Sequence, residues 1–170
     1  NTMNQYGIKS VLKHFPGEAD QCKSVTDLSH LGLKIKKNSE VYICNILDKI
    51  EFDKNVEMFI DVPSDAVMIG QGIYTQLSPY PALLEPQMRV WLVNKLKYKK
   101  PIISDALWEI EATPQTIIRA LKTVDFVMVG TPKTVEDSLP YIQEAIKKGE
   151  LKKEDIQHKI SLFNSFQKNE

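Results

Sequence analysis

Residues 11–17, Val-Leu-Lys-His-Phe-Pro-Gly, place a Lys-His pair between a short apolar run and a Pro-Gly break. The residues from Ile8 to Leu12 are β-prone, so Lys13 and His14 are expected directly after the end of a strand. In an α/β protein, polar side chains at a strand end tend to face a functional site, because the strand fixes their position and the loop exposes them. The stretch therefore predicts a site that includes Lys13 and His14.

Three further apolar runs predict strands, and helical patterns separate them. Strands are expected over 66–70, 101–104 and 125–130, since each run is short and continuous, as in a strand buried on both faces. Helices are expected over 40–47, from Asp53 to the break at Pro63, and over 86–96, 114–122, 134–148 and 152–166. In the last of these helices, four apolar side chains are expected to face inward: Ile156, Ile160, Leu162 and Phe163.

The regular alternation of strands and helices predicts the α/β class, with a parallel sheet and right-handed crossovers. Residues 1–170 are expected to form a single α/β domain. Two architectures fit the pattern: an open doubly wound sheet, and half of a (β/α)8 barrel, since a complete barrel takes about 250 residues. The chain begins with Asn1 rather than an initiator methionine, and we expect it to be a piece of a longer protein.

The amino-acid composition and the missing motifs exclude several classes of binding partner and cofactor. The 22 basic and 22 acidic residues cancel, so no overall field favours nucleic acid or an anionic membrane. No apolar run approaches the ~20 residues of a membrane span. The glycine-rich motifs of nucleotide binding are missing, and we expect no cofactor. Cys22 and Cys44 lie far apart and outside any CxxC pair, which predicts two buried thiols rather than a zinc site or a disulfide framework. The sequence leaves the compartment open, with the cytoplasm favoured.

A carboxylate and a loop histidine are the candidate reacting groups. Asp105 directly follows the apolar run 102–104, where it could act as a nucleophile, base, metal ligand or helix cap. His30 lies in a long loop over 18–37, three residues after Asp27, and could shuttle protons there or be an ordinary exposed histidine. The three histidines show no H-x-x-H spacing, so we expect no metal site. A strand-end carboxylate with a loop proton donor fits glycoside hydrolysis.

Four motifs in order strengthen this interpretation. They are Lys-His-Phe-Pro-Gly at 13–17, Asp-Leu-Ser-His at 27–30, the run from Val67-Met68 to Ile73-Tyr74, and Ile-Ser-Asp-Ala-Leu at 103–107. Together they resemble glycoside hydrolase family 3, in its β-N-acetylglucosaminidase branch, over nearly the whole chain from Ile8 to Glu170. The resemblance corresponds to the C-terminal half of the family's (β/α)8 barrel.

The resemblance implies a role for each matching residue. Asp105 matches the nucleophile of a retaining β-glycosidase, which forms a covalent glycosyl-enzyme intermediate, and His30 matches the general acid and base. Lys13 and His14 match a pair that hydrogen-bonds sugar hydroxyls. The implied substrate is terminal β-linked N-acetylglucosamine, in amino-sugar oligosaccharides or cell-wall fragments.

The sequence also departs from the family's pattern. Leu28 stands where the family has the aspartate that orients the histidine, and Asp27, one residue further from His30, could take over this role. Gln71 stands where the family has a histidine, and Gly-Glu-Ala at 17–19 replaces Gly-His-Gly. The first four β-α units of the barrel have no counterpart. A second hypothesis therefore stays open: a catalytically incomplete half-barrel that acts as a binding module or completes its site with a partner, either a second copy of itself or a separate N-terminal half.

Overall fold

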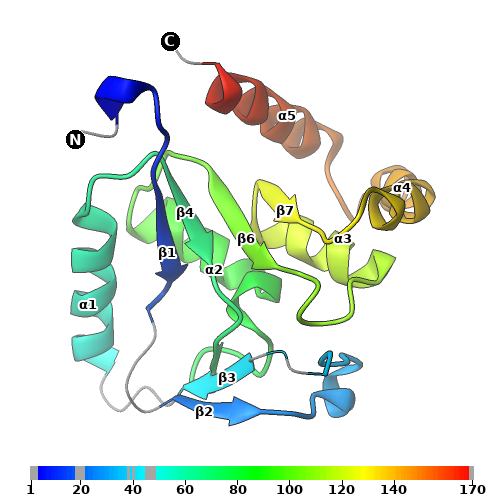
Figure 1. The fold of residues 1–170 in the computed structure, drawn as a ribbon, viewed down its shortest axis with the longest axis horizontal. Helices are drawn as coiled ribbons and strands as arrows, with labels where there is room; N and C mark the ends of the chain where they lie inside the picture. The colour runs from blue at the N-terminus through cyan, green and yellow to red at the C-terminus, as the bar shows by residue number, and fades with distance from the viewer. Residues whose placement is uncertain (1–3, 18–21, 38, 40, 45–48, 169–170) are drawn as a thin grey trace.

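The computed structural model describes residues 4–17, 22–37, 39, 41–44 and 49–168. A four-stranded parallel sheet runs through its centre in the order β1-β4-β6-β7 (Figure 1). Its strands are β1 (Val11–Phe15), β4 (Ala66–Ile69), β6 (Ile102–Ala106) and β7 (Phe126–Met128). The predicted α/β class with a parallel sheet is confirmed. Each strand lies beside the next along the chain with no reversal of order, which is the arrangement of a barrel wall rather than of a doubly wound sheet.

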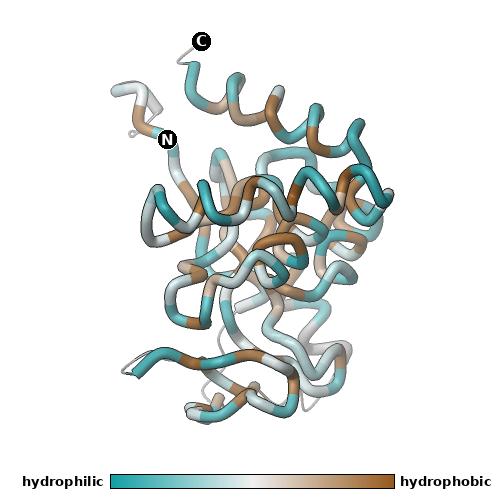
Figure 2. The backbone as a smooth tube through the Cα atoms, turned by 90° about the vertical axis from the view of Figure 1, so that its right-hand side faces the viewer, coloured by the Kyte–Doolittle hydropathy of each residue, from teal (hydrophilic) through white to brown (hydrophobic). Residues whose placement is uncertain are grey.

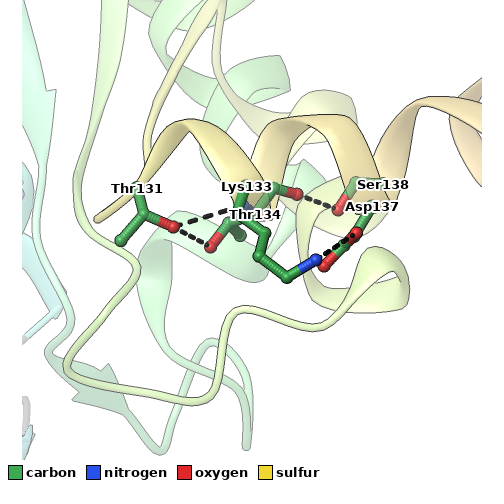
Figure 3. A network of polar contacts seen from close by, with 5 residues as sticks. All are labelled: Thr131, Lys133, Thr134, Asp137 and Ser138. Carbon is green, nitrogen blue, oxygen red and sulfur yellow. Dashed lines mark hydrogen bonds and ion pairs between the residues drawn. The ribbon is translucent and has the colours of Figure 1, made fainter.

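Three of the helices begin where the sequence places a capping residue and a proline, whereas α1 (Lys49–Asp61) begins four residues before Asp53, its predicted start. The other helices are α2 (Pro86–Val90), which continues as a π-helical turn η4 (Trp91–Lys95), α3 (Pro114–Thr123), α4 (Pro132–Lys147) and α5 (Lys153–Gln167), with short 3-10 turns η1 (Asn4–Tyr6), η2 (Ser29–Leu31) and η3 (Ala82–Leu84). At the start of α4 the Thr131 side chain accepts a hydrogen bond from Thr134 N, and Ser138 Oγ donates to Thr134 O one turn later (Figure 3). A side-chain cap followed by a proline explains why the helices predicted from 86, 114 and 134 onward form close to the expected positions. The helix predicted from 152 also forms close to its expected start, without a side-chain cap.

A second, three-stranded sheet lies beyond the carboxyl ends of β1, β4 and β6 (Figure 1). It consists of β2 (Cys22–Val25), β3 (Val41–Cys44) and β5 (Ile73–Tyr74). The helix predicted over 40–47 is therefore wrong at residues 41–44, where β-branched side chains favour a strand once β2 and β5 pair with it. Residues 40 and 45–47 of that prediction lie outside the described residues.

The two cysteines form a disulfide rather than two buried thiols, so that prediction is wrong. Antiparallel pairing of β2 with β3 sets Cys22 directly opposite Cys44, with 4.1 Å between their Cα atoms. The sequence alone could not predict that the two cysteines are close, because 22 positions separate them and the pairing of the strands is non-local.

The two faces of the main sheet differ in burial. Val67, Ile69, Ile102 and Ser104 are fully buried, whereas Met68, Ile103 and Asp105 are half-buried. Because Met68 pairs with Ile103 in register, these side chains lie on the same face. Asp105 thus projects from the more open face of the sheet, near its carboxyl end.

The last strand and the last helix, β7 and α5, are less buried than predicted. β7 was expected to be a buried strand, but all three of its residues are half-buried, because β7 is an edge of the sheet. On α5, Ile160 is 56% and Phe163 43% exposed, so the predicted inward face is wrong for both. Figure 2 shows apolar and hydrophilic residues alternating along α5, which lies at one end of the molecule. Phe163 still contacts Phe126 of β7 edge-on, with 5.3 Å between ring centroids.

A buried lysine ties α5 to the body. Lys159 is 7% exposed, and its Nζ donates to the main-chain oxygens of Leu121 and Val124 at the end of α3. Burial lowers the pKa of Lys159 to about 8, and the nearby Arg89 guanidinium acts in the same direction.

This pKa predicts a pH dependence of stability. The unfolded state binds the Lys159 proton more tightly than the folded state, so stability from this group is lost as the pH falls through about 8. Between about pH 7 and 9, we expect the free energy of unfolding to rise by about 1 kcal/mol relative to a Lys159→Met variant. Urea denaturation of both proteins at the two pH values measures the difference. The same pH dependence in the two proteins would contradict it.

Candidate active site

Lys13 and His14 lie inside β1 rather than after its end, which corrects the predicted strand of residues 8–12. The register of β1 against β4 shifts between Leu12 and Phe15, so the Lys-His pair occupies an irregularity in the ladder. Irregularities of this kind change the direction in which side chains point, and they are common beside functional sites. The Lys13 side chain is exposed, and that of His14 is half-buried.

His14 faces Asp105 across the carboxyl end of the sheet. The distance from His14 Nε2 to Asp105 Oδ2 is 3.7 Å, and the two side chains are 25% and 21% exposed. The other carboxylate oxygen, Oδ1, accepts a hydrogen bond of 2.8 Å from the backbone N–H of Ala106. One oxygen of Asp105 is thus held by the backbone, the other faces a histidine, and the side chain as a whole is partly exposed. The structure brings together two of the predicted site residues from strands that are more than 90 positions apart.

Gly70 makes this approach possible. A Cβ at position 70 would lie 2.8 Å from His14 Cβ, which is closer than side chains tolerate. The glycine at the end of β4 therefore provides the space that His14 occupies between β1 and β6.

Gln71 and Glu109 form a polar link next to Asp105. Gln71 Nε2 donates to Ala106 O at 2.7 Å and to Glu109 Oε2 at 2.8 Å. The link joins the exit of β4 to the segment that follows β6, and Gln71 is only 4% exposed.

The loop that carries His30 is anchored to the same segment. Lys36 N donates to Glu109 O at 2.9 Å, and Glu111 N donates to Lys34 O at 2.8 Å, so residues 34–36 run antiparallel to 109–111. His30 itself lies in η2 and is exposed. Within the described ranges, no hydrogen bond or ion pair joins His30 to Asp105.

Asp27 caps the turn that contains His30. Its Oδ1 accepts from Ser29 N at 2.8 Å. This backbone hydrogen bond and one from the Ser29 hydroxyl lower the pKa of Asp27, and the charge of His30 makes a smaller contribution in the same direction. Asp27 therefore stabilises the start of η2, and it lies close enough to His30 for the two charges to interact.

Two residues near Asp105 were missed by the sequence reasoning. Trp108 is 40% exposed and packs its Cβ against Gly130, just after β7. Glu109 contacts Gln71, as described above. An exposed tryptophan and a second carboxylate within four residues of a strand-end aspartate are the signal that could have indicated both.

No group of three or more metal-ligating side chains occurs within the part of the chain that the structure describes. In the same part, none of the helices has the length and apolar character needed to cross a membrane.

Comparison with known proteins identifies the family of this chain. The family described as "Glycosyl hydrolase family 3 N terminal domain" matches residues 1–163. The chain belongs to glycosyl hydrolase family 3. The predicted family is thereby confirmed, and the sheet is part of a barrel-like domain of this family. No match was found among the curated proteins.

Several solved structures share the fold. A fungal multi-domain family 3 β-N-acetylglucosaminidase has a TM-score of 0.73 and 23% identity, over 95% of this chain and 20% of the other. CbsA from Thermotoga neapolitana has a TM-score of 0.74 and 16% identity, over 96% and 35%. A family 3 glycosyl hydrolase from Mycobacterium smegmatis has a TM-score of 0.71 and 19% identity, over 96% and 52%. The chain thus spans between a fifth and about half of the lengths of these proteins.

Proposed function

We propose that this chain carries the nucleophile of a retaining β-glycosidase that hydrolyses terminal β-linked N-acetylglucosamine. The observation that supports this most strongly is the Asp105 carboxylate, which projects from the carboxyl end of a parallel strand and faces His14 in a family 3 chain. The choice of sugar rests on the Lys-His-Phe-Pro-Gly motif. It also fits the β-N-acetylglucosaminidases among the solved neighbours, including one from Paenibacillus.

In the proposed reaction, Asp105 Oδ2 attacks the anomeric carbon while Oδ1 stays bound to Ala106 N. The bond from the anomeric carbon to the leaving oxygen breaks, and His30 donates a proton to that oxygen. A water then attacks the glycosyl-Asp105 ester, His30 takes the proton of that water, and the carboxylate is released. Lys13 and His14 hydrogen-bond the sugar hydroxyls.

The proposal assigns the loop a positioning role. His30 is exposed in η2, and the loop is fastened to residues 109–111 by backbone hydrogen bonds. In our proposal the loop places His30 beside the glycosidic oxygen when substrate binds, and Asp27 orients His30 by capping the turn.

Substitution of Gly70 tests the importance of the His14 position. In Gly70→Ala, the new methyl group displaces His14, and we expect kcat/KM of the enzyme to fall by about 10- to 100-fold. The milder clash in Gly130→Ala, where the added carbon would lie 3.3 Å from Trp108 Cβ, shows separately what a small displacement of Trp108 costs. Circular dichroism checks that both variants fold. Unchanged kcat/KM in a folded Gly70→Ala variant would argue against a role for His14.

A second candidate function is that of a half-barrel which needs a partner. β1 and β7 are the two edges of the parallel sheet, and the chain covers only 20–52% of the solved proteins described above. We propose that the chain corresponds to the C-terminal half of the family's barrel, so that a second copy or an N-terminal half completes it.

The partner hypothesis predicts how the isolated 170 residues behave. We expect little or no turnover of a chromogenic β-N-acetylglucosaminide by this segment alone, and hydrolysis by the assembled or parent protein. Light scattering should give the mass of a dimer, or of a complex when the other half is added. A well-folded, monomeric and active segment would contradict the need for a partner.

A further inference from the structure

Gln71 has a hydrogen-bonding group that the protein leaves unused. Both donor hydrogens of its amide face acceptors, Ala106 O and Glu109 Oε2. Its Oε1 is buried and has no hydrogen-bond partner among the described residues. A buried amide oxygen without a partner costs folding free energy, so its presence calls for an explanation.

The direction of the amide is fixed by its neighbours. If the amide were turned over, Oε1 would lie against a carbonyl oxygen and a carboxylate oxygen, and the NH₂ group would lose both acceptors. The two acceptors therefore force the amide to present its oxygen on the other side.

The Gln71 amide group belongs to the same corner of the sheet as Asp105. Gln71 is bonded to Ala106, the residue directly after Asp105, and follows Gly70, whose surface His14 covers. The Gln71 amide group is therefore bonded to the residue next to the carboxylate that a ligand at Asp105 would meet.

We propose that Gln71 Oε1 accepts a hydrogen bond from the sugar bound at Asp105 and makes Gln71 a specificity-determining residue. The sugar must then offer an N–H or O–H donor at that position, and an analogue that lacks the donor leaves the oxygen unsatisfied. The inference rests on the proposed function only in taking the ligand to be a sugar. A glutamine that merely tied β4 to the segment after β6 would affect every ligand to the same degree.

The test measures binding of unreactive monosaccharides to the protein. N-acetylglucosamine, glucose and analogues that each lack one hydroxyl or the acetamido group are titrated by NMR into native protein, Gln71→Met and Gln87→Met. Gln87 is an exposed glutamine of α2 and supplies the matched control. We expect Gln71→Met to weaken N-acetylglucosamine binding about tenfold. We expect no loss for the one analogue that lacks the donor, and no effect of Gln87→Met.

Three results would overturn the inference: an equal loss for all sugars in Gln71→Met, no loss for any sugar, or no sugar binding by native protein. If Gln71→Met does not fold, the side-chain amide signals of Gln71 in native protein decide. They should shift with N-acetylglucosamine and not with the analogue that lacks the donor, and equal shifts would contradict the inference. Turnover of a chromogenic β-N-acetylglucosaminide is assayed separately with the assembled protein. Binding that depends on Gln71, without hydrolysis, would contradict the proposed function and support this inference. Hydrolysis together with an equal loss of binding for all sugars would support the proposed function and contradict this inference.

Discussion

The Asp105→Asn substitution is expected to lower kcat of the assembled enzyme by a factor on the order of 10³ or more. Asparagine keeps the shape of the side chain, and its carbonyl oxygen can still accept the hydrogen bond from Ala106 N. It lacks the negative charge that attacks the anomeric carbon and stabilises the oxocarbenium-like transition state. The loss should therefore be in the chemical step, while the fold is retained. Steady-state kinetics with a chromogenic β-N-acetylglucosaminide measures it.

A matched control separates charge loss from general damage. Asp137 on α4 is 60% exposed and pairs with Lys133 at 3.2 Å, far along the chain from the site (Figure 3). Because exposed ion pairs contribute little, Asp137→Asn should keep native activity. In Asp105→Gly, azide should restore turnover by attacking in place of the carboxylate. Activity within a few-fold of native in Asp105→Asn would refute the assignment of the nucleophile.

Removal of the disulfide is expected to cost about 3 kcal/mol in the free energy of unfolding. The bond closes a loop with a sequence separation of 22 residues, and this loop contains His30. Without the cross-link the unfolded chain gains conformational entropy, and the pairing of β2 with β3 is left to backbone hydrogen bonds. The loop should then hold His30 less firmly, so activity should fall together with stability.

The double variant Cys22→Ser/Cys44→Ser is compared with native protein by chemical denaturation, with and without a thiol reductant. Reductant should destabilise native protein to the level of the double variant and leave the variant itself unaffected. Equal stability of the oxidised native protein and the variant would show that the disulfide contributes nothing. A stable disulfide is typical of oxidising compartments, which weighs against the cytoplasm.

The parallel sheet could be predicted because its strands carry a local signal. The run at 66–70 is apolar throughout, and β4 is almost entirely buried on both faces. Asp105 directly follows such a run, so its place near a strand end is predicted from the sequence alone, although it lies inside β6 rather than after it.

The second sheet gave no such signal. Val-Tyr-Ile-Cys at 41–44 fits one turn of a helix as well as a short strand, and the choice depends on pairing with β2 and β5. The same pairing forms the disulfide. Tertiary contacts, rather than local propensity, determine both features.

The polar link at the site was also beyond sequence reasoning. In the sequence, Gln71 is only a departure from the family's histidine. Its orientation depends on Ala106 and Glu109, which are 35 and 38 positions away. The roles of His30 and Asp27 stay predictions. Asp27 accepts a hydrogen bond from Ser29 N. Among the described residues, neither His30 nor Asp27 forms a hydrogen bond or ion pair with Asp105.

The central claim is that Asp105 forms a covalent bond to the sugar, and mass spectrometry tests it most directly. The active protein is mixed with a β-N-acetylglucosaminide analogue that has a fast leaving group and a slowly hydrolysed glycosyl-enzyme intermediate, then quenched and digested. We predict that the peptide containing Asp105 gains the mass of one glycosyl residue, and that Asp105→Asn gains none. A label on another residue, or rapid loss of the leaving group with no labelled peptide, would contradict the account.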